Sequence, residues 1–343
     1  MLRRLVAFAA WGVGGRAGSS PRPRFASMCI AAPSLAPKER EALARRCALH
    51  ACSLSLTTAP RDPPLVLVSG LAAHQVAAIE RAGAETVESP GLPPWNASGD
   101  VWRRRPPALA ASKEPARLYT YHKLHAWDPR VVKGAPRVAF VDADAIYVRN
   151  ASALLEIEPP SAFYLRDACR PPNIPWHRWD PGIEIDGEPV PKARAYWNTG
   201  VVVYEPDATV ARDLWRLYAT GDFASLDPDQ YVCEGDLLQT YYWRRWRGSR
   251  PHVLNAAWNF RGYKCSYADV ADASRVRVVH KEERRAITLI FDACEHVRAP
   301  PRGARPRFLE ELVSALDVGA CRSPAAAAAL RRTCPDQAQG GVG

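Results

Sequence analysis

Residues 137–148 read Arg-Val-Ala-Phe-Val-Asp-Ala-Asp-Ala-Ile-Tyr-Val, a short hydrophobic run that ends in two carboxylates one residue apart. The run from Arg137 to Val141 predicts a buried strand, because its four apolar residues follow one another without a break. In open α/β sheets, ligands bind at the carboxyl ends of the strands. Asp142 and Asp144 can share a divalent cation there, together with a diphosphate. A bare pair of this kind also occurs where one aspartate caps the next segment and the other is solvated.

Short apolar runs alternate with helical patterns on both sides of this stretch, which predicts an α/β fold with a mostly parallel sheet. The clearest β-α-β unit has a strand at Leu65 to Val68, a helix at Leu71 to Arg81 and a strand at Glu85 to Glu88. Gly83 is expected to end this helix, because glycine adopts the left-handed conformation readily. The other expected elements are strands at Phe25 to Ile30, Ala162 to Leu165 and Gly200 to Tyr204, and helices at Glu114 to Trp127, Val210 to Leu217 (ending at Gly221) and Leu237 to Trp243.

The composition indicates one large domain with short appendages. The chain has 343 residues, of which 47% are hydrophobic and 24% charged, so disordered and fibrous classes are excluded. No stretch approaches the roughly 18 apolar residues of a membrane-spanning helix, which excludes a multi-pass membrane protein. Residues 1–23 begin with basic residues and an apolar run and resemble a targeting or signal segment. We expect one large domain at 24–320 and a disordered tail, rich first in Ala and then in Gln and Gly, at 321–343.

Charge and cysteine usage limit the partners. Half of the net charge of +10 comes from five arginines within the first 37 residues, and short arginine runs such as 103–105 and 243–247 are more often solvated faces than phosphate sites. No nucleic-acid partner is therefore expected. The nine cysteines lack paired CxxC spacing, which disfavours zinc and disulfide scaffolds and leaves the redox compartment open. Asn96 and Asn150 begin glycosylation triplets. With the N-terminal segment they favour the secretory pathway or Golgi lumen, with another organelle or the cytoplasm as alternatives.

Between Leu65 and His280 the chain carries six short blocks whose common order is more specific than any one of them. The blocks are Tyr121-His-Lys-Leu-His-Ala-Trp127, Val141-Asp-Ala-Asp144, Tyr196-Trp-Asn-Thr-Gly-Val-Val-Val-Tyr204, Glu234-Gly-Asp-Leu-Leu-Gln239, Trp258-Asn-Phe260 and Val278-Val-His280. In this order they resemble glycosyltransferase family 8, the group that includes glycogenin and galactinol synthase. The resemblance implies a single Rossmann-like domain of the GT-A, nucleotide-diphospho-sugar transferase type. It also implies transfer of a hexose from a UDP-sugar donor to a hydroxyl acceptor, with retention of configuration. Carbohydrate, polyol and glycoconjugate acceptors all stay open.

The resemblance further implies a metal site and a donor site. The expected metal is Mn²⁺, or else Mg²⁺, because the ligands include carboxylate oxygens. The implied metal ligands are Asp142, Asp144 and His280. The residues implied to contact the UDP-sugar are Lys123, Asp142, Ala143, Asp144, Asn198 and Lys281. Without the matching blocks, Lys123 would be interpreted as an exposed helix lysine and His280 as a structural histidine after a strand.

Asn198, Glu234 and Asp236 are implied to face the sugar as catalytic residues. Amide and carboxylate groups can pair with sugar hydroxyls, and a carboxylate on the reacting face stabilises oxocarbenium-like charge. The competing interpretation is that Asn198 caps a turn while the two acids lie in the first turn of a helix, where the dipole favours them.

Three departures from the family pattern concern the donor and the reacting face. Gly235 stands where the family usually has Gln, and Asp229-Gln230 offers an alternative alignment of the catalytic block. The family's closing motif is missing after His280, where Lys281, Arg284 or Arg285 are candidates for its lysine. Ala31-Ala32-Pro33 lacks the polar residues expected near uracil.

Two other functions fit parts of the sequence. A haloacid-dehalogenase-like phosphatase also has Asp-x-Asp after a hydrophobic strand, but that motif usually lies near the start of the chain and here about 140 residues precede it. A catalytically inactive glycan-binding protein of the same fold is favoured by Gly235 and the missing closing motif. The Trp-rich loop within 169–191 would then serve as its binding surface.

Overall fold

The computed structural model describes residues 21–58, 60–94, 118–164, 184–185, 188–189, 197–223, 233–246, 252–254, 256–259 and 276–280. Its centre is a sheet of seven strands in the order β10-β6-β9-β4-β1-β2-β3. These strands are β1 (Arg24–Ile30), β2 (Leu65–Ser69), β3 (Glu85–Glu88), β4 (Val138–Val141), β6 (Ser161–Tyr164), β9 (Trp197–Tyr204) and β10 (His252–Val253). β3, β2, β1 and β4 are parallel neighbours, β10 is parallel to β6, and β9 runs antiparallel to both β4 and β6. The predicted α/β fold with a mostly parallel sheet is confirmed.

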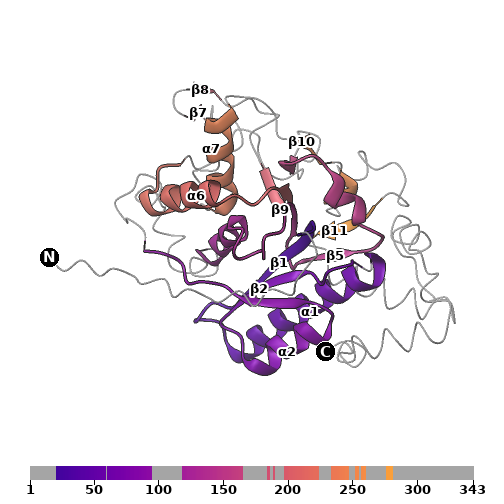
Figure 1. The fold of residues 1–343 in the computed structure, drawn as a ribbon. Coiled ribbons are helices and arrows are strands. Elements are labelled where there is room, and N and C mark those ends of the chain that lie inside the picture. The colour runs from indigo at the N-terminus through magenta and orange to yellow at the C-terminus, as the bar shows by residue number, and fades with distance from the viewer. Residues whose placement is uncertain are drawn as a thin grey trace, which may run out of the picture.

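Helices cover both faces of this sheet (Figure 1). One face carries α1 (Pro37–Thr58) and α2 (Ala73–Arg81), and the other carries the 3₁₀ helix η1 (Tyr119–Trp127), α6 (Ala208–Thr220) and α7 (Glu234–Trp246). Side chains alternate along each strand, so Leu65 and Leu67 of β2 join the core under η1, α6 and α7, whereas Val66 and Val68 join the core under α1 and α2. Because both faces are covered, the central strands are hydrophobic throughout, which is the pattern that the sequence shows.

Two further two-stranded sheets complete the described structure. β5 (Ala145–Tyr147) follows the two aspartates and pairs antiparallel with β11 (Val278–His280), and β7 (Glu184–Ile185) pairs with β8 (Glu188–Pro189). Two short 3₁₀ helices, η2 (Ser152–Glu156) and η6 (Ala256–Trp258), lie between strands. Among the described residues, no helix combines the length and the apolarity needed to cross a bilayer.

The strands and helices expected around Leu65 to Glu88 are confirmed, as are the later strands and the helices now labelled α6 and α7. Gly83 and Gly221 follow α2 and α6 with φ of 96° and 67°, the left-handed conformation that favours glycine. α7 begins three residues earlier than expected, at Glu234. The helix expected at Glu114 to Trp127 is described from residue 118 onward and is 3₁₀ rather than α.

The sequence did not predict α1. Its residues 49 to 54 are all buried, since β1, β5 and α2 pack around this part of the helix. A helix buried on all sides loses the one-sided apolar stripe by which a surface helix is recognised. The sequence also did not predict the disulfide between Cys29 of β1 and Cys47 of α1, which lie 18 residues apart.

Most of the loops 90–107 and 169–191, residues 1–20 of the predicted N-terminal segment and the whole predicted tail lie outside the described residues. The boundaries proposed at 23 and 320 therefore stay predictions.

Candidate metal centre and active site

The two aspartates lie where β4 ends. Asp142 directly follows β4, and its backbone N–H donates to the carbonyl of Gly200 in β9 at 2.8 Å. The Asp142 carbonyl in turn accepts from the N–H of Ala145 at 3.0 Å, which forms a tight turn that places Asp144 close to Asp142. Their side chains are 22% and 28% exposed, so both carboxylates reach solvent from a mostly covered position.

His280 joins these carboxylates through the small second sheet. The pairing of β11 with β5 sets His280 opposite Ala145, next to Asp144. The imidazole Nε2 lies 3.0 Å from Asp144 Oδ1 and 3.8 Å from Asp142 Oδ2, and the ring is 1% exposed. One ligand atom from each of the three residues lies within 4.8 Å of the others. The three predicted metal ligands are thus brought together from positions up to 138 residues apart, from Asp142 to His280.

The chemistry of this group fits a divalent cation. Nε2 of His280 is buried and has no hydrogen-bond partner among the described residues, although it faces carboxylate oxygens. An imidazole lone pair and a carboxylate oxygen repel one another at this distance unless a proton or a cation lies between them. Carboxylates suit Mg²⁺ and Mn²⁺, whereas imidazole suits transition metals, so the mixed set of donors favours Mn²⁺ over Mg²⁺.

Lys123 lies beneath the metal group and is almost fully buried. Its ammonium contacts Asp142 Oδ1 at 2.7 Å, Glu234 Oε1 at 2.9 Å and the carbonyl of Thr199 at 3.0 Å. Burial alone would lower the pKa of this ammonium, but Asp142 and Glu234 outweigh that effect and raise the pKa above its ordinary value. An ammonium has three protons, and these three contacts use them. In this arrangement Lys123 orients Asp142, and its predicted contact with a diphosphate would require one of these bonds to be exchanged.

Glu234 shares this buried network. Burial acts to raise the pKa of its carboxyl, but Lys123 and hydrogen bonds from Thr120 and Thr199 hold the pKa below its usual value. Thr199 Oγ1 donates to Glu234 Oε1 at 2.7 Å. Glu234 is therefore a charged carboxylate that is paired with a lysine.

Asp236 lies two residues further along α7 and is also buried. Its Oδ2 accepts from the backbone N–H of Cys233 at 2.9 Å, as a carboxylate does in the capping of a helix start. The geometry therefore gives Asp236 a definite structural contact beside its predicted catalytic role. The alternative block Asp229-Gln230 lies outside the described residues.

Asn198 and Asn259 connect β9 to His280. Asn198 Oδ1 accepts from the N–H of Gly200 at 3.0 Å and from Asn259 Nδ2 at 2.8 Å. Asn259 Oδ1 lies 2.7 Å from His280 Nδ1. Gly200 leaves room for this ring, because a Cβ at that position would lie 2.0 Å from His280 Cε1. The sequence analysis assigns no role to Asn259. Its block, Trp258-Asn-Phe260, is one of the six blocks, but the block alone does not indicate what this asparagine does.

The other predicted residues are placed as follows. Ala143 is buried between the two aspartates. Lys281, which was predicted to contact the donor, lies outside the described residues, as do Arg284 and Arg285. Ala31 and Ala32 directly follow β1 and are buried.

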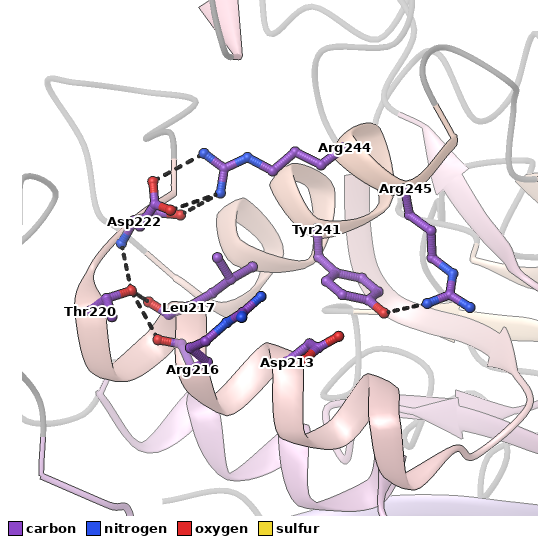
Figure 2. A pocket seen from close by; sticks show the side chains of 8 residues that line it. All are labelled: Asp213, Arg216, Leu217, Thr220, Asp222, Tyr241, Arg244 and Arg245. Atoms are coloured by element: carbon purple, nitrogen blue, oxygen red, sulfur yellow. Dashed lines mark hydrogen bonds and ion pairs between the residues drawn. The ribbon is translucent and has the colours of Figure 1, made fainter.

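A separate pocket lies between α6 and α7 (Figure 2). It is lined by Asp213, Arg216, Leu217, Thr220, Asp222, Tyr241, Arg244 and Arg245. Arg244 pairs with Asp222 at 3.0 Å, and Arg245 donates to the Tyr241 hydroxyl at 2.9 Å. These arginines thus bind neighbouring side chains on the outer end of α7, in agreement with a solvated face.

By sequence, the chain matches no known protein family and no curated protein. Several solved glycosyltransferases have a similar structure. The galactosyltransferase LgtC in complex with donor and acceptor sugar analogues is 14% identical, with a TM-score of 0.46 over 86% of this chain and 96% of that chain. Mouse xyloside xylosyltransferase 1 is 16% identical, with a TM-score of 0.42 over 76% of this chain and 98% of that chain. The bifunctional glycosyltransferase WbbM is 11% identical, with a TM-score of 0.46 over 93% of this chain and 52% of that chain. Membership of glycosyltransferase family 8 stays a prediction from the six blocks.

Proposed function

We propose that this protein is a metal-dependent glycosyltransferase that moves a hexose from a UDP-sugar to a hydroxyl acceptor with retention of configuration. The observation that carries the proposal is the convergence of Asp142, Asp144 and His280 at the carboxyl end of β4. This edge of an open α/β sheet is where nucleotide ligands bind. The UDP-sugar, the hexose and membership of family 8 rest on the six-block resemblance.

The donor site needs positive charge, because the diphosphate gains charge as the sugar leaves it. A bound Mn²⁺ would neutralise that developing charge as a Lewis acid. Asp142, Asp144 and His280 would hold it, and Lys123 would keep Asp142 turned toward it through the 2.7 Å ion pair. The buried base of the site, which includes Lys123 and Thr199, excludes water from beneath the ligands.

The reacting face is proposed to involve Asn198 and Glu234. The oxygen of the Asn198 amide is occupied by Gly200 and Asn259, which leaves its nitrogen to donate to a sugar hydroxyl. Glu234 keeps a negative charge near the site, where it favours oxocarbenium-like positive charge on the sugar. Asp236 is the third proposed member, two residues further along α7.

We place the protein in the secretory pathway and leave its acceptor among carbohydrates, polyols and glycoconjugates. The Cys29–Cys47 disulfide supports an oxidising compartment. Asn150 is exposed and begins a glycosylation triplet, and its Oδ1 accepts from the N–H of Ser152 at 2.8 Å. Both features agree with the N-terminal segment that resembles a signal sequence.

The first test is calorimetric binding of UDP and of UDP-sugars with and without Mn²⁺, followed by donor hydrolysis. We expect UDP to bind only with Mn²⁺, and Asp144→Ala to lower metal-dependent hydrolysis at least 100-fold, because it removes one of three ligand side chains. Asp222→Ala is the matched control, since Asp222 lies at the far pocket and contacts Arg244. Full activity in Asp144→Ala would refute the metal role.

The same experiment separates the alternatives. Metal-dependent hydrolysis of a generic phosphomonoester, with no effect of UDP-sugar, would indicate the phosphatase. Binding of UDP-sugar or glycan without any turnover would indicate the inactive binding protein.

A further inference from the structure

The three hydrogen bonds that run from β9 to His280 have only one consistent direction. The backbone N–H of Gly200 can only donate, so the atom of Asn198 that faces it at 3.0 Å must be the side-chain oxygen. That oxygen can only accept, so Asn259 must turn its NH₂ group toward it at 2.8 Å. The reversed Asn259 amide would set two oxygens against each other.

This direction fixes the proton on the histidine ring. With its NH₂ group toward Asn198, Asn259 presents its oxygen to His280 Nδ1 at 2.7 Å, and an oxygen there requires an N–H on Nδ1. Nε2 is then the nitrogen that is left to bind a cation, and it lies 3.0 Å from Asp144 Oδ1. All three side chains are nearly inaccessible, with exposures of 6% for Asn198, 0% for Asn259 and 1% for His280, so water does not compete for these bonds.

We propose that Asn198 and Asn259 are positioning residues that hold His280 in its Nδ1–H tautomer, so that Nε2 is presented to a divalent cation before the cation arrives. The proposal rests on the metal site of the proposed function and assigns a role to Asn259. It also adds a second role to Asn198, which was expected only to face the sugar. Partners of the non-ligating nitrogen commonly orient metal-bound histidines, and here that partner is an amide whose own direction is set by a backbone N–H.

The first test needs no metal. The full-length protein is labelled with ¹⁵N-histidine, and long-range ¹H–¹⁵N correlations assign the protonated nitrogen of each ring, with His280→Gln identifying the His280 signals. We expect Nδ1 of His280 to carry a proton, because it faces the Asn259 oxygen. A ring protonated at Nε2 alone would overturn the proposal.

Variants then test whether Asn198 and Asn259 hold the His280 ring in this tautomer. Asn259→Leu is expected to lose the Nδ1–H tautomer and to weaken Mn²⁺ binding about 10- to 100-fold, measured by calorimetry on the same samples. Asn259→Asp loses the NH₂ group that donates to Asn198 but keeps an acceptor for Nδ1–H, so it is expected to bind Mn²⁺ more tightly than Asn259→Leu. Unchanged tautomer and Mn²⁺ affinity in a folded Asn259→Leu protein would overturn the proposal. If that variant does not fold, Asn198→Asp, which keeps the acceptor for both Gly200 and Asn259, must retain the wild-type tautomer.

Failure of the proposed function looks different. Wild-type protein that binds no Mn²⁺, yet shows the Nδ1–H tautomer, would remove the metal site while leaving the positioning of the ring intact.

Discussion

Lys123 lies between two carboxylates that reach it from different elements, Asp142 after β4 and Glu234 at the start of α7. Removing one member of a buried charge network costs more than removing a surface pair, because the remaining charges stay buried without compensation. The side chain of Lys123 is 1% exposed, so solvent does not replace the lost partner. The residue therefore matters to folding as well as to the site.

Lys123→Met keeps the length of the side chain and removes its charge. We expect it to lower the free energy of unfolding by about 3 kcal/mol or more, measured by urea denaturation at pH 7. The control is Lys133→Met, which breaks a pair with Glu85 in which the lysine is 46% exposed, and which should cost less than about 1 kcal/mol. Equal midpoints for the two variants would show that Lys123 does not hold the two carboxylates.

At the scale of single residues, the sequence predicts those site residues that belong to short motifs. Asp142 and Asp144 follow a hydrophobic strand, and the order of the blocks singles out His280; the structure brings all three together. The sequence could not predict the partners of Lys123, because its contacts with Thr199 and Glu234 join residues 76 and 111 positions apart. The use of the Asn198 oxygen by Asn259 depends on side-chain direction, which spacing does not fix.

Among the elements, η1 stands out because it carries two histidines in a buried setting. Burial lowers the pKa of His122 to about 4 and that of His125 to about 4. His122 Nδ1 lies 2.8 Å from Ser89 Oγ, in the segment that follows β3. The helix thus joins the sheet through rings that are neutral at physiological pH.

This neutrality makes stability depend on pH. The unfolded rings titrate near pH 6.5 and the folded rings near pH 4, so below pH 6.5 the unfolded chain binds more protons and stability falls as the pH falls toward 4. Between pH 7 and pH 5, the titration of His122 should lower the free energy of unfolding by about 1 to 2 kcal/mol. The variant His122→Asn keeps a polar group near Ser89. In urea denaturation, its free energy of unfolding should fall less than that of the wild type over this pH range, by the same amount. An identical pH dependence in variant and wild type would mean that His122 is accessible to protons in the folded state.

The elements also show where sequence patterns reach their limit. β2, α2 and β3 are adjacent in sequence and in space, so local periodicity predicts them. α1 is surrounded by protein near its C-terminal end, so its pattern lacks a polar face. The antiparallel direction of β9 beside β4 comes from a long connection that residue patterns do not determine.

For the molecule as a whole, the Cys29–Cys47 disulfide is a covalent link between the sheet and its first helix. Both sulfurs are buried in the core that α1 and α2 share with β1 and β2. A crosslink of this length restricts the unfolded chain and stabilises a protein by about 3 kcal/mol. Such a bond persists in an oxidising compartment, which connects the stability of the fold to the proposed location.

We expect a reducing agent to lower the free energy of unfolding of the wild-type protein by about 3 kcal/mol. The double variant Cys29→Ala/Cys47→Ala should be less stable than the oxidised wild type by a similar amount. Urea denaturation with and without dithiothreitol measures both. This expectation would be contradicted if the unfolding midpoint of the wild type did not change with the reductant while mass spectrometry showed that the bond was reduced.

The separation of the ligands along the chain has a consequence for biosynthesis. Asp142 and Asp144 leave the ribosome well before His280, on the order of 10 s earlier at ordinary rates of translation. During that interval a nascent chain holds two neighbouring carboxylates without their third partner. Lys123 precedes both of them in the chain and contacts Asp142 directly, so the charge that balances the first carboxylate is made before the carboxylate itself. The cation site can then be completed late, when the three residues of β11 add themselves to β5.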